Sequence, residues 1–405
     1  MSLDSWLQRH RRQRLDLDSG EIVSLNLVDR PKPSIDEAPT STVAEPADEQ
    51  PIIHPPAGPW NRKYLLLSIA LIPLVFSLLA PNNTRDIAER FSHTVGQLPP
   101  RDQARILEGV LKKNITLQDL IMRLPDHRIE GAHLSRDSWM HWLYAMIAAG
   151  VFFGALTLVF PASRATPRQL LRIGIFTGTI GILLLICFQA AAAGTDGVWL
   201  KGFGIVTAIF YIVKFIGYSY AAALDPKNGF LLSAMGFTFG VGFCEEVAKM
   251  LPLVRHFRYH ATLDWRGACL WGLASGVGFG VSEGISYASS YYNGVQSAPI
   301  YAVRFISCVG LHAIWSGAAA VMLFERQSSL QTHCSSLEFI WRLLQIVAIP
   351  MILHGLYDTL LKKDMPAVAL LAAVVSFGWM VYQFERYHHK EHNPETDSMV
   401  AAGAV

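Results

Sequence analysis

Long apolar stretches separated by short polar connections dominate the chain from about residue 64 onward. About nine of them are long enough, at ~1.5 Å per helical residue, to cross a hydrocarbon core of about 30 Å. They lie at about 64–80, 139–160, 170–193, 202–223, 230–252, 267–287, 303–324, 340–361 and 366–383. This pattern predicts an all-α fold, a polytopic transmembrane helix bundle of about eight to nine spans with a small helical insertion outside the membrane.

The polar segments mark the expected boundaries between the parts of the chain. The first 60 residues contain many Pro, Asp, Glu, Ser and Thr residues without sustained periodicity, which is typical of disorder. After the first apolar stretch, Ile106, Val110, Leu117 and Leu120 recur at helical spacing. We therefore expect a disordered N-terminal tail at 1–60, a first transmembrane helix at 61–80, an extramembrane helical loop at 81–138, a transmembrane bundle at 139–383 and a polar C-terminal tail at 384–405.

The composition supports an integral, multi-pass membrane protein. Hydrophobic residues make up 51% of the chain and charged residues only 16%, whereas soluble domains carry about 25% charged residues. The formal charge of +2 argues against a nucleic-acid binder. None of the five cysteines forms a CxxC pair, which argues against a disulfide framework or a cysteine zinc site. Basic residues occur in loops on both sides of the membrane, so they do not decide the orientation. We favour a cytoplasmic N-terminus because it places the 81–138 loop outside the cytoplasm.

Four polar clusters interrupt the apolar stretches in the second half of the chain. The first contains Glu245, Glu246 and Lys249. Adjacent helical positions point about 100° apart, so the glutamates face different neighbours, whereas Lys249 lies one turn from Glu245. Either glutamate can pair with Lys249 while the other turns to a neighbouring helix. A buried ion pair that only fixes helix packing is the alternative, but the surplus negative charge would then be costly to bury.

The second and third clusters each place one ionisable residue in an apolar helix. Glu283 lies beside a GxxxG stripe, which lets helix backbones approach closely in membranes. The stripe consists of Gly272, Gly276, Gly280 and Gly284. Glu283 is either a functional carboxylate or a protonated packing residue. His312 is either a hydrogen-bonded packing residue or a ligand.

The fourth cluster contains His354 and Asp358, which lie one turn apart on the same helix face. This spacing allows both side chains to ligate one metal ion. Alternatively, Asp358 accepts a hydrogen bond from His354, which fixes the tautomer of the ring and leaves its other nitrogen for a substrate, a water or a metal.

The four clusters fall on consecutive spans, and such a concentration favours function over packing. Outside the four clusters, Lys214 and Arg304 occur in the apolar stretches as isolated charges. Charged groups in hydrocarbon are costly, so they usually face a shared cavity. Carboxylates and histidines are the groups that activate water, either as a general base or as ligands of a metal ion.

The order and spacing of these residues resemble the motif set of the PrsW family of intramembrane proteases, which is related to the CAAX prenyl endopeptidases. The matching motifs are Glu245-Glu246-x-x-Lys249, Phe279-x-x-x-Glu283, His312 in His-Ala-x-Trp, and His354-x-x-x-Asp358. The resemblance covers about residues 200–362. It implies an integral membrane endopeptidase of the bacterial inner membrane that hydrolyses peptide bonds of membrane-associated proteins, notably anti-sigma-factor-like regulators. The family is divided between metalloprotease and glutamate protease mechanisms.

The resemblance also implies roles for individual residues. The expected catalytic residues are Glu245, Glu246, Glu283, His354 and Asp358, with Lys249 and His312 in support. One of the two glutamates would activate a water, directly or on a zinc ion, and Lys249 would keep the first glutamate ionised. His354 and Asp358 would bind the metal or stabilise the oxyanion. If zinc is the cofactor, its candidate ligands are Glu283, His312, His354 and Asp358. The expected partners are a membrane-anchored protein substrate and the lipid bilayer, with no nucleic acid.

Two other functions fit the same clusters. A proton- or cation-coupled transporter also uses intramembrane carboxylates and histidines. However, nothing similar to the clusters occurs in residues 64–223, as an inverted repeat would require. A non-catalytic membrane scaffold is the other alternative, and it predicts that the clusters tolerate neutral substitution.

Overall fold

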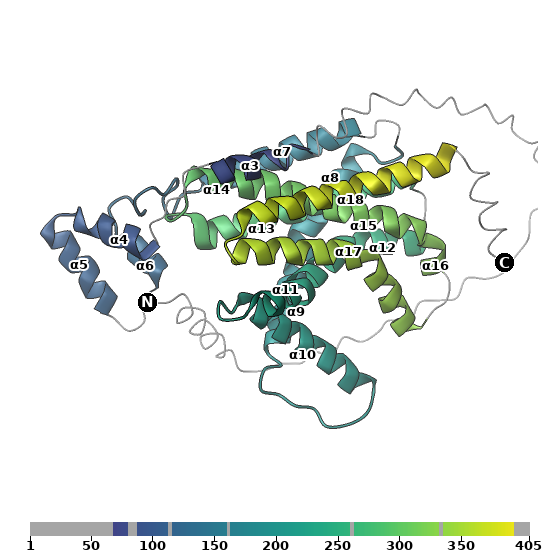
Figure 1. The fold of residues 1–405 in the computed structure, drawn as a ribbon, viewed down its shortest axis with the longest axis horizontal. Helices are drawn as coiled ribbons and strands as arrows, with labels where there is room; N and C mark the ends of the chain where they lie inside the picture. Colours follow the sequence, from purple (N-terminus) through teal and green to yellow (C-terminus); the bar gives the residue numbers. More distant parts are fainter. Residues whose placement is uncertain are drawn as a thin grey trace, which may run out of the picture. The chain divides into compact units, whose positions relative to one another are not determined.

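The computed structural model describes residues 68–79, 87–111, 116–159, 163–259, 263–331 and 335–392 (Figure 1). The expected tail at 1–60 lies outside these residues, and so does the beginning of the expected first span. Every regular element in the described part of the chain is a helix, which confirms the all-α prediction.

Seven described helical segments are long and apolar enough to cross a membrane: Met140–Leu158, Pro167–Ala193, Ile205–Leu224, Phe230–Tyr259, Ala298–Glu325, Leu337–Lys362 and Pro366–His389. They are built from α7 (Met140–Val159), α8 (Pro167–Phe176), η1 (Thr177–Gly181), α9 (Ile182–Ala193), α10 (Ile205–Leu224), α11 (Phe230–Gly236), η2 (Phe237–Gly242), α12 (Phe243–Tyr259), α14 (Ala298–Ala302), η4 (Val303–Cys308), α15 (Val309–Glu325), α17 (Ser336–Lys362) and α18 (Pro366–His392), where η marks a π-helical segment. α18 continues past the expected end of the last span at 383.

The helix α13 (Trp265–Tyr287) is long enough to be a further span, but its glycines and polar residues make it less apolar than the other seven. It continues into η3 (Ala288–Tyr292), and the short helix α16 (Gln327–Gln331) follows α15. α15 packs against α13, α17 and α18, and the four helices run side by side (Figure 1). Their apolar side chains, with those of α12, form the largest hydrophobic core.

The glycine stripe brings the backbones of α13 and α15 into direct contact. A Cβ atom added at Gly276 would lie 2.2 Å from the carbonyl oxygen of His312, and one added at Gly272 would lie 2.4 Å from that of Ser316. A side chain at either position would therefore collide with the neighbouring backbone. The close approach that the stripe predicts is present, and it sets the distance between the helices that carry Glu283 and His312.

Two π-helical segments precede the functional helices. η2 leads into α12, and η4 leads into α15. Close contacts hold η2 against α17, because a Cβ atom at Gly355 would lie 2.5 Å from the Cα atom of Thr238. π-helical turns are rare and occur frequently at functional sites.

Short helices outside the long segments complete the described part of the chain. They are α3 (Ile72–Leu79), α4 (Ile87–Gly96), α5 (Pro100–Leu111) and α6 (Leu117–Ile121). The last three fall in the expected extramembrane loop. Buried Arg90 in α4 donates hydrogen bonds to the carbonyl oxygens of Glu130 (2.6 Å) and Val295 (2.8 Å). Backbone hydrogen bonds also join Ile129 to Gly294, so these short helices are attached to the loop between η3 and α14.

Candidate functional site

The first polar cluster lies in α12, where its three ionisable side chains are buried. The Nζ atom of Lys249 donates a hydrogen bond to Oε1 of Glu246 at 2.7 Å and lies 3.7 Å from Oε2 of Glu245. Of the two pairings that the spacing allows, the lysine hydrogen-bonds the second glutamate and stays within ion-pair distance of the first. The Oε2 atom of Glu245 is buried and has no hydrogen-bond partner among the described residues.

His312 connects the first cluster to the second. Its Nδ1 atom lies 2.7 Å from Nζ of Lys249, and its Nε2 atom lies 2.7 Å from Oε2 of Glu283. A lysine ammonium group can only donate a hydrogen bond, so Nδ1 accepts and Nε2 carries the hydrogen that Glu283 accepts. The imidazole is thus held in one tautomer by partners on α12 and α13.

His354 connects the first cluster to the fourth. Its Nδ1 atom lies 3.0 Å from Oε1 of Glu246. Its Nε2 atom faces two carboxylates, at 3.7 Å from Oε2 of Glu245 and 3.4 Å from Oδ2 of Asp358. With 27% of its side chain exposed, Asp358 is the most accessible carboxylate of the site. The contacts fit the second arrangement considered for this pair, in which a carboxylate orients the ring, but the orienting group is Glu246.

Arg304 belongs to the same network, although it looks isolated in the sequence. Its Nη2 atom lies 2.6 Å from Oε1 of Glu283, and its guanidinium carbon lies 4.1 Å from the centre of the Tyr287 ring. Arg304 precedes His312 by about two helical turns. The spacing gave no usable signal, because Arg304 lies in the π-helical segment η4 and a period of 3.6 residues does not apply between it and His312.

Trp315 supports His354 from α15. The two rings stack with their centres 4.3 Å apart and their planes 18° apart. The indole Nε1–H of Trp315 donates a hydrogen bond to Oγ of Ser376 on α18 at 2.9 Å. In the sequence the tryptophan stands out only as part of a motif, and nothing singles out Ser376, since a serine in an apolar span carries no distinguishing pattern.

Glu245, His312 and His354 form a buried group whose ligand atoms all lie within 4.8 Å of one another. Oε2 of Glu245 lies 3.7 Å from Nε2 of His354 and 4.0 Å from Nδ1 of His312. Zinc takes carboxylate oxygens and imidazole nitrogens at about 2.0–2.2 Å, which puts tetrahedral ligand atoms about 3.4 Å apart. The unpaired oxygen of Glu245 and the donor types fit a zinc ion, with Lys249 moved away from His312. Glu283 and Asp358, included among the expected ligands, are not in this group of three.

The charges of the described site also suit a divalent cation. Four carboxylates face two permanent cations: Glu245, Glu246, Glu283 and Asp358 against Lys249 and Arg304. With neutral histidines and ionised carboxylates, the site has an excess of two negative charges. Burying such an excess is costly, and a divalent cation would offset it.

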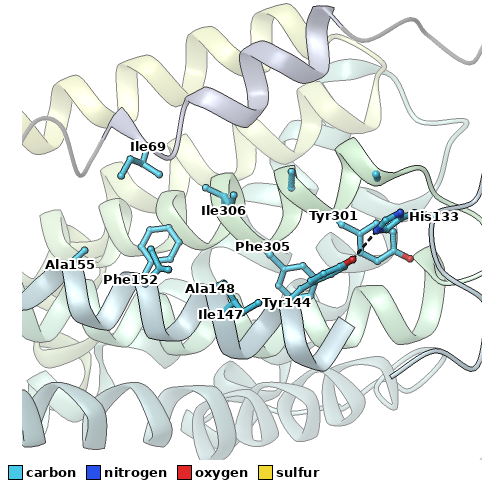
Figure 2. Close-up of a pocket in the computed structure, with 13 residues that line it drawn as sticks. Ile69, His133, Tyr144, Ile147, Ala148, Phe152, Ala155, Tyr301, Phe305 and Ile306 are labelled. Carbon is cyan, nitrogen blue, oxygen red and sulfur yellow. Dashed lines mark hydrogen bonds between the residues drawn. The ribbon is translucent and has the colours of Figure 1, made fainter. Parts of the chain in front are cut away.

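A separate apolar cavity of about 340 Å³ is lined by residues of α7, α14 and η4, among others (Figure 2). Phe305 and Ile306 line it, next to Arg304 in the sequence, together with residues of α7. At one end, Tyr144 and His133 share a hydrogen bond of 2.8 Å. None of the ionisable residues of the four clusters lines this cavity.

A polytopic helical bundle with carboxylates and histidines gathered around one buried point has the architecture of an intramembrane protease. Comparison with protein families agrees with this class. Residues 197–383 match the PrsW family intramembrane metalloprotease model. No curated protein and no solved structure matches the chain. The resemblance seen in the sequence motifs is confirmed, and the match extends through most of α18, beyond the range of those motifs.

Proposed function

We propose that this integral membrane protease is an endopeptidase that cleaves membrane-anchored protein substrates with Glu245, His312 and His354 at its chemical centre. The observation that carries the proposal is the buried Oε2 atom of Glu245, which has no hydrogen-bond partner in the described part of the chain and faces Nε2 of His354 inside the bundle. The match to this family model supports peptide-bond hydrolysis as the reaction. The corresponding substrates are membrane-bound regulators of the anti-sigma-factor type in the inner membrane of a bacterium.

The two glutamates have different roles in this proposal. Oε1 of Glu246 lies at hydrogen-bond distance from both Lys249 (2.7 Å) and His354 (3.0 Å). A carboxylate held in this way orients the histidine and fixes its tautomer. Each glutamate has a buried second oxygen without a hydrogen-bond partner among the residues that the structure describes, but only Glu245 belongs to the buried group of possible metal ligands, with its Oε2 atom facing Nε2 of His354. We therefore assign the reactive role to Glu245 and the orienting role to Glu246.

Zinc held by Glu245, His312 and His354 would supply a Lewis acid that polarises the peptide carbonyl. Asp358 lies beside Nε2 of His354 and is the most exposed carboxylate. It is placed to accept the proton of the attacking water and to return it to the leaving amine, as a general base and then a general acid. Glu283 keeps His312 in its tautomer.

The test is cleavage of a tagged single-span protein reconstituted with the enzyme in lipid vesicles. Glu245→Gln keeps the shape of the side chain but removes its charge, so cleavage should fall by about 10² or more. Glu246→Gln should reduce cleavage by about 10–100-fold, the usual effect of losing a group that orients a metal ligand. Glu338→Gln is the matched control, because Glu338 lies at the start of α17 with 48% of its side chain exposed.

The outcomes of this experiment decide between the alternatives. Loss of cleavage in a chelator and recovery with zinc would support the metal mechanism, whereas full cleavage in the chelator would support a glutamate protease with Glu245 as general base. A well-folded variant with both Glu245 and Glu246 changed to Gln that still cleaves at the wild-type rate would refute the assignment. A transporter or a scaffold would leave every tested substrate intact.

A further inference from the structure

Arg304 is a buried cation at the edge of the site. It is 8% exposed, and its guanidinium group contacts Oε1 of Glu283 at 2.6 Å and the face of the Tyr287 ring at 4.1 Å. Both contacts reach across to α13, whereas Arg304 itself lies in η4. Removing a charge from water is costly, and the cost is recovered only when the partner and the geometry are well defined. Arg304 therefore holds Glu283 in one orientation.

The orientation of Glu283 determines what its second oxygen can do. While Oε1 of Glu283 contacts Arg304, its Oε2 atom lies 2.7 Å from Nε2 of His312. An ionised carboxylate only accepts hydrogen bonds, so the hydrogen of the imidazole must be on Nε2. The lone pair of His312 is then on Nδ1, which faces Lys249 at 2.7 Å and Glu245 at 4.0 Å.

We propose that Arg304 is a positioning residue: through Glu283 it fixes the Nε2–H tautomer of His312 and directs the Nδ1 lone pair towards Glu245 and the reacting groups. The proposal rests on the proposed function and adds to it a residue outside the four motifs. It follows from two contacts on opposite oxygens of one carboxylate. A lysine at position 304 would keep the charge but lose the planar group that contacts both the carboxylate and the Tyr287 ring.

A purely structural ion pair makes a different prediction from a positioning pair. Arg304→Met or Glu283→Gln alone would leave an uncompensated buried charge and would destabilise the bundle in either case. The double variant Arg304→Met/Glu283→Gln has no unpaired charge. If the pair is only structural, this double variant regains both folding and cleavage. If the pair positions His312, it regains folding but still cleaves about 10–100-fold more slowly than the wild type.

The chain offers a matched control pair. Arg386 of α18 and Glu325 of α15 also form an Arg–Glu contact at 2.6 Å that joins two helices. Neither residue belongs to the site. In detergent, the double variant Arg386→Met/Glu325→Gln should therefore unfold at about the same temperature as the Arg304 double variant. Its cleavage rate should equal that of the wild type. Arg304→Lys, which keeps the charge and hence the fold, should show an intermediate loss of cleavage.

A second measurement does not depend on activity. Nitrogen NMR of ¹⁵N-histidine-labelled protein in detergent, with the His312 signal assigned by its loss in His312→Gln, reports which ring nitrogen carries the hydrogen. We expect a single Nε2–H form in the wild type. In the Arg304 double variant, Lys249 alone among the described partners of His312 still favours that form, and we expect a measurable share of the other tautomer. An unchanged tautomer, or wild-type cleavage by the folded double variant, would overturn the proposal. Failure of the wild type to cleave any substrate, with the tautomer shift still present, would instead refute only the proposed function.

Discussion

The contact between Gly276 of α13 and the backbone of His312 on α15 makes a prediction with a magnitude. In Gly276→Ala the new Cβ atom would start 2.2 Å from the carbonyl oxygen of His312. Carbon–oxygen contacts between packed helices lie at about 3.3 Å or more, so the backbones must separate by about 1 Å. The obstacle is a backbone oxygen, which cannot rotate away as a side chain can.

Two consequences should follow from this displacement. Overpacking of a close helix contact typically costs about 1–3 kcal/mol of folding free energy. In addition, α15 would carry His312 away from Glu245 on α12, and a misplacement of about 1 Å can reduce catalysis about 10²-fold. Gly276→Ala should therefore lower the thermal unfolding temperature in detergent moderately and reduce cleavage strongly.

The matched control is Gly378→Ala on α18, where an added Cβ atom would meet nothing within 4 Å. Because alanine favours a helix over glycine by about 1 kcal/mol, this variant should be as stable as the wild type or more so. The assay compares both variants in vesicles at equal amounts of folded enzyme. If Gly276→Ala cleaves and melts like the wild type, the inference that the backbone contact sets the position of His312 is wrong.

Three further predictions concern other contacts. Trp315→Leu should reduce cleavage by about 10-fold or more in folded enzyme, because it removes the ring that stacks on His354. Asp358→Asn should slow cleavage by about 10² if Asp358 is the general base, without changing the zinc content measured by elemental analysis. The pKa of Asp119 in α6 is lowered, chiefly by its hydrogen bond with the side chain of Thr116, so its stabilising effect should be complete above the unfolded pKa of about 3.9 and lost as the pH falls through the lower folded value. Amide hydrogen exchange of α6 should therefore accelerate only in strong acid, and acceleration already at pH 5 would contradict this.

Much of the fold could be predicted from the sequence because membrane helices obey two strict rules. The length of an apolar stretch indicates whether it can span the membrane. A charged residue inside a span is energetically costly, so its presence indicates a function. These rules were sufficient to identify the bundle and the residues that converge in it. The detailed pairing of Lys249 was not predictable, because Glu245 and Glu246 are both within reach of its long side chain and only the neighbouring His354 and His312 distinguish them.

The role of Arg304 was hidden by local helix geometry. The π-helical segment η4 includes Arg304 and ends before His312, so a period of 3.6 residues does not apply between the two. Its partner, Glu283, comes from another helix, and single-sequence periodicity carries no information about such pairs. The same applies to Trp315 and Ser376, which meet only because α15 and α18 pack together.

The attachment of the short helices α4 to α6 has a mechanical consequence. Arg90 and the backbone of Ile129 bind the loop at Gly294 and Val295. That loop joins the helix carrying Glu283 to the segment carrying Arg304, the two partners of one ion pair. A displacement of these short helices would therefore move the loop that joins the two partners, and would change how Arg304 lies against Glu283. The position of the short helices would in this way be coupled to the orientation of Glu283 and, through it, to His312.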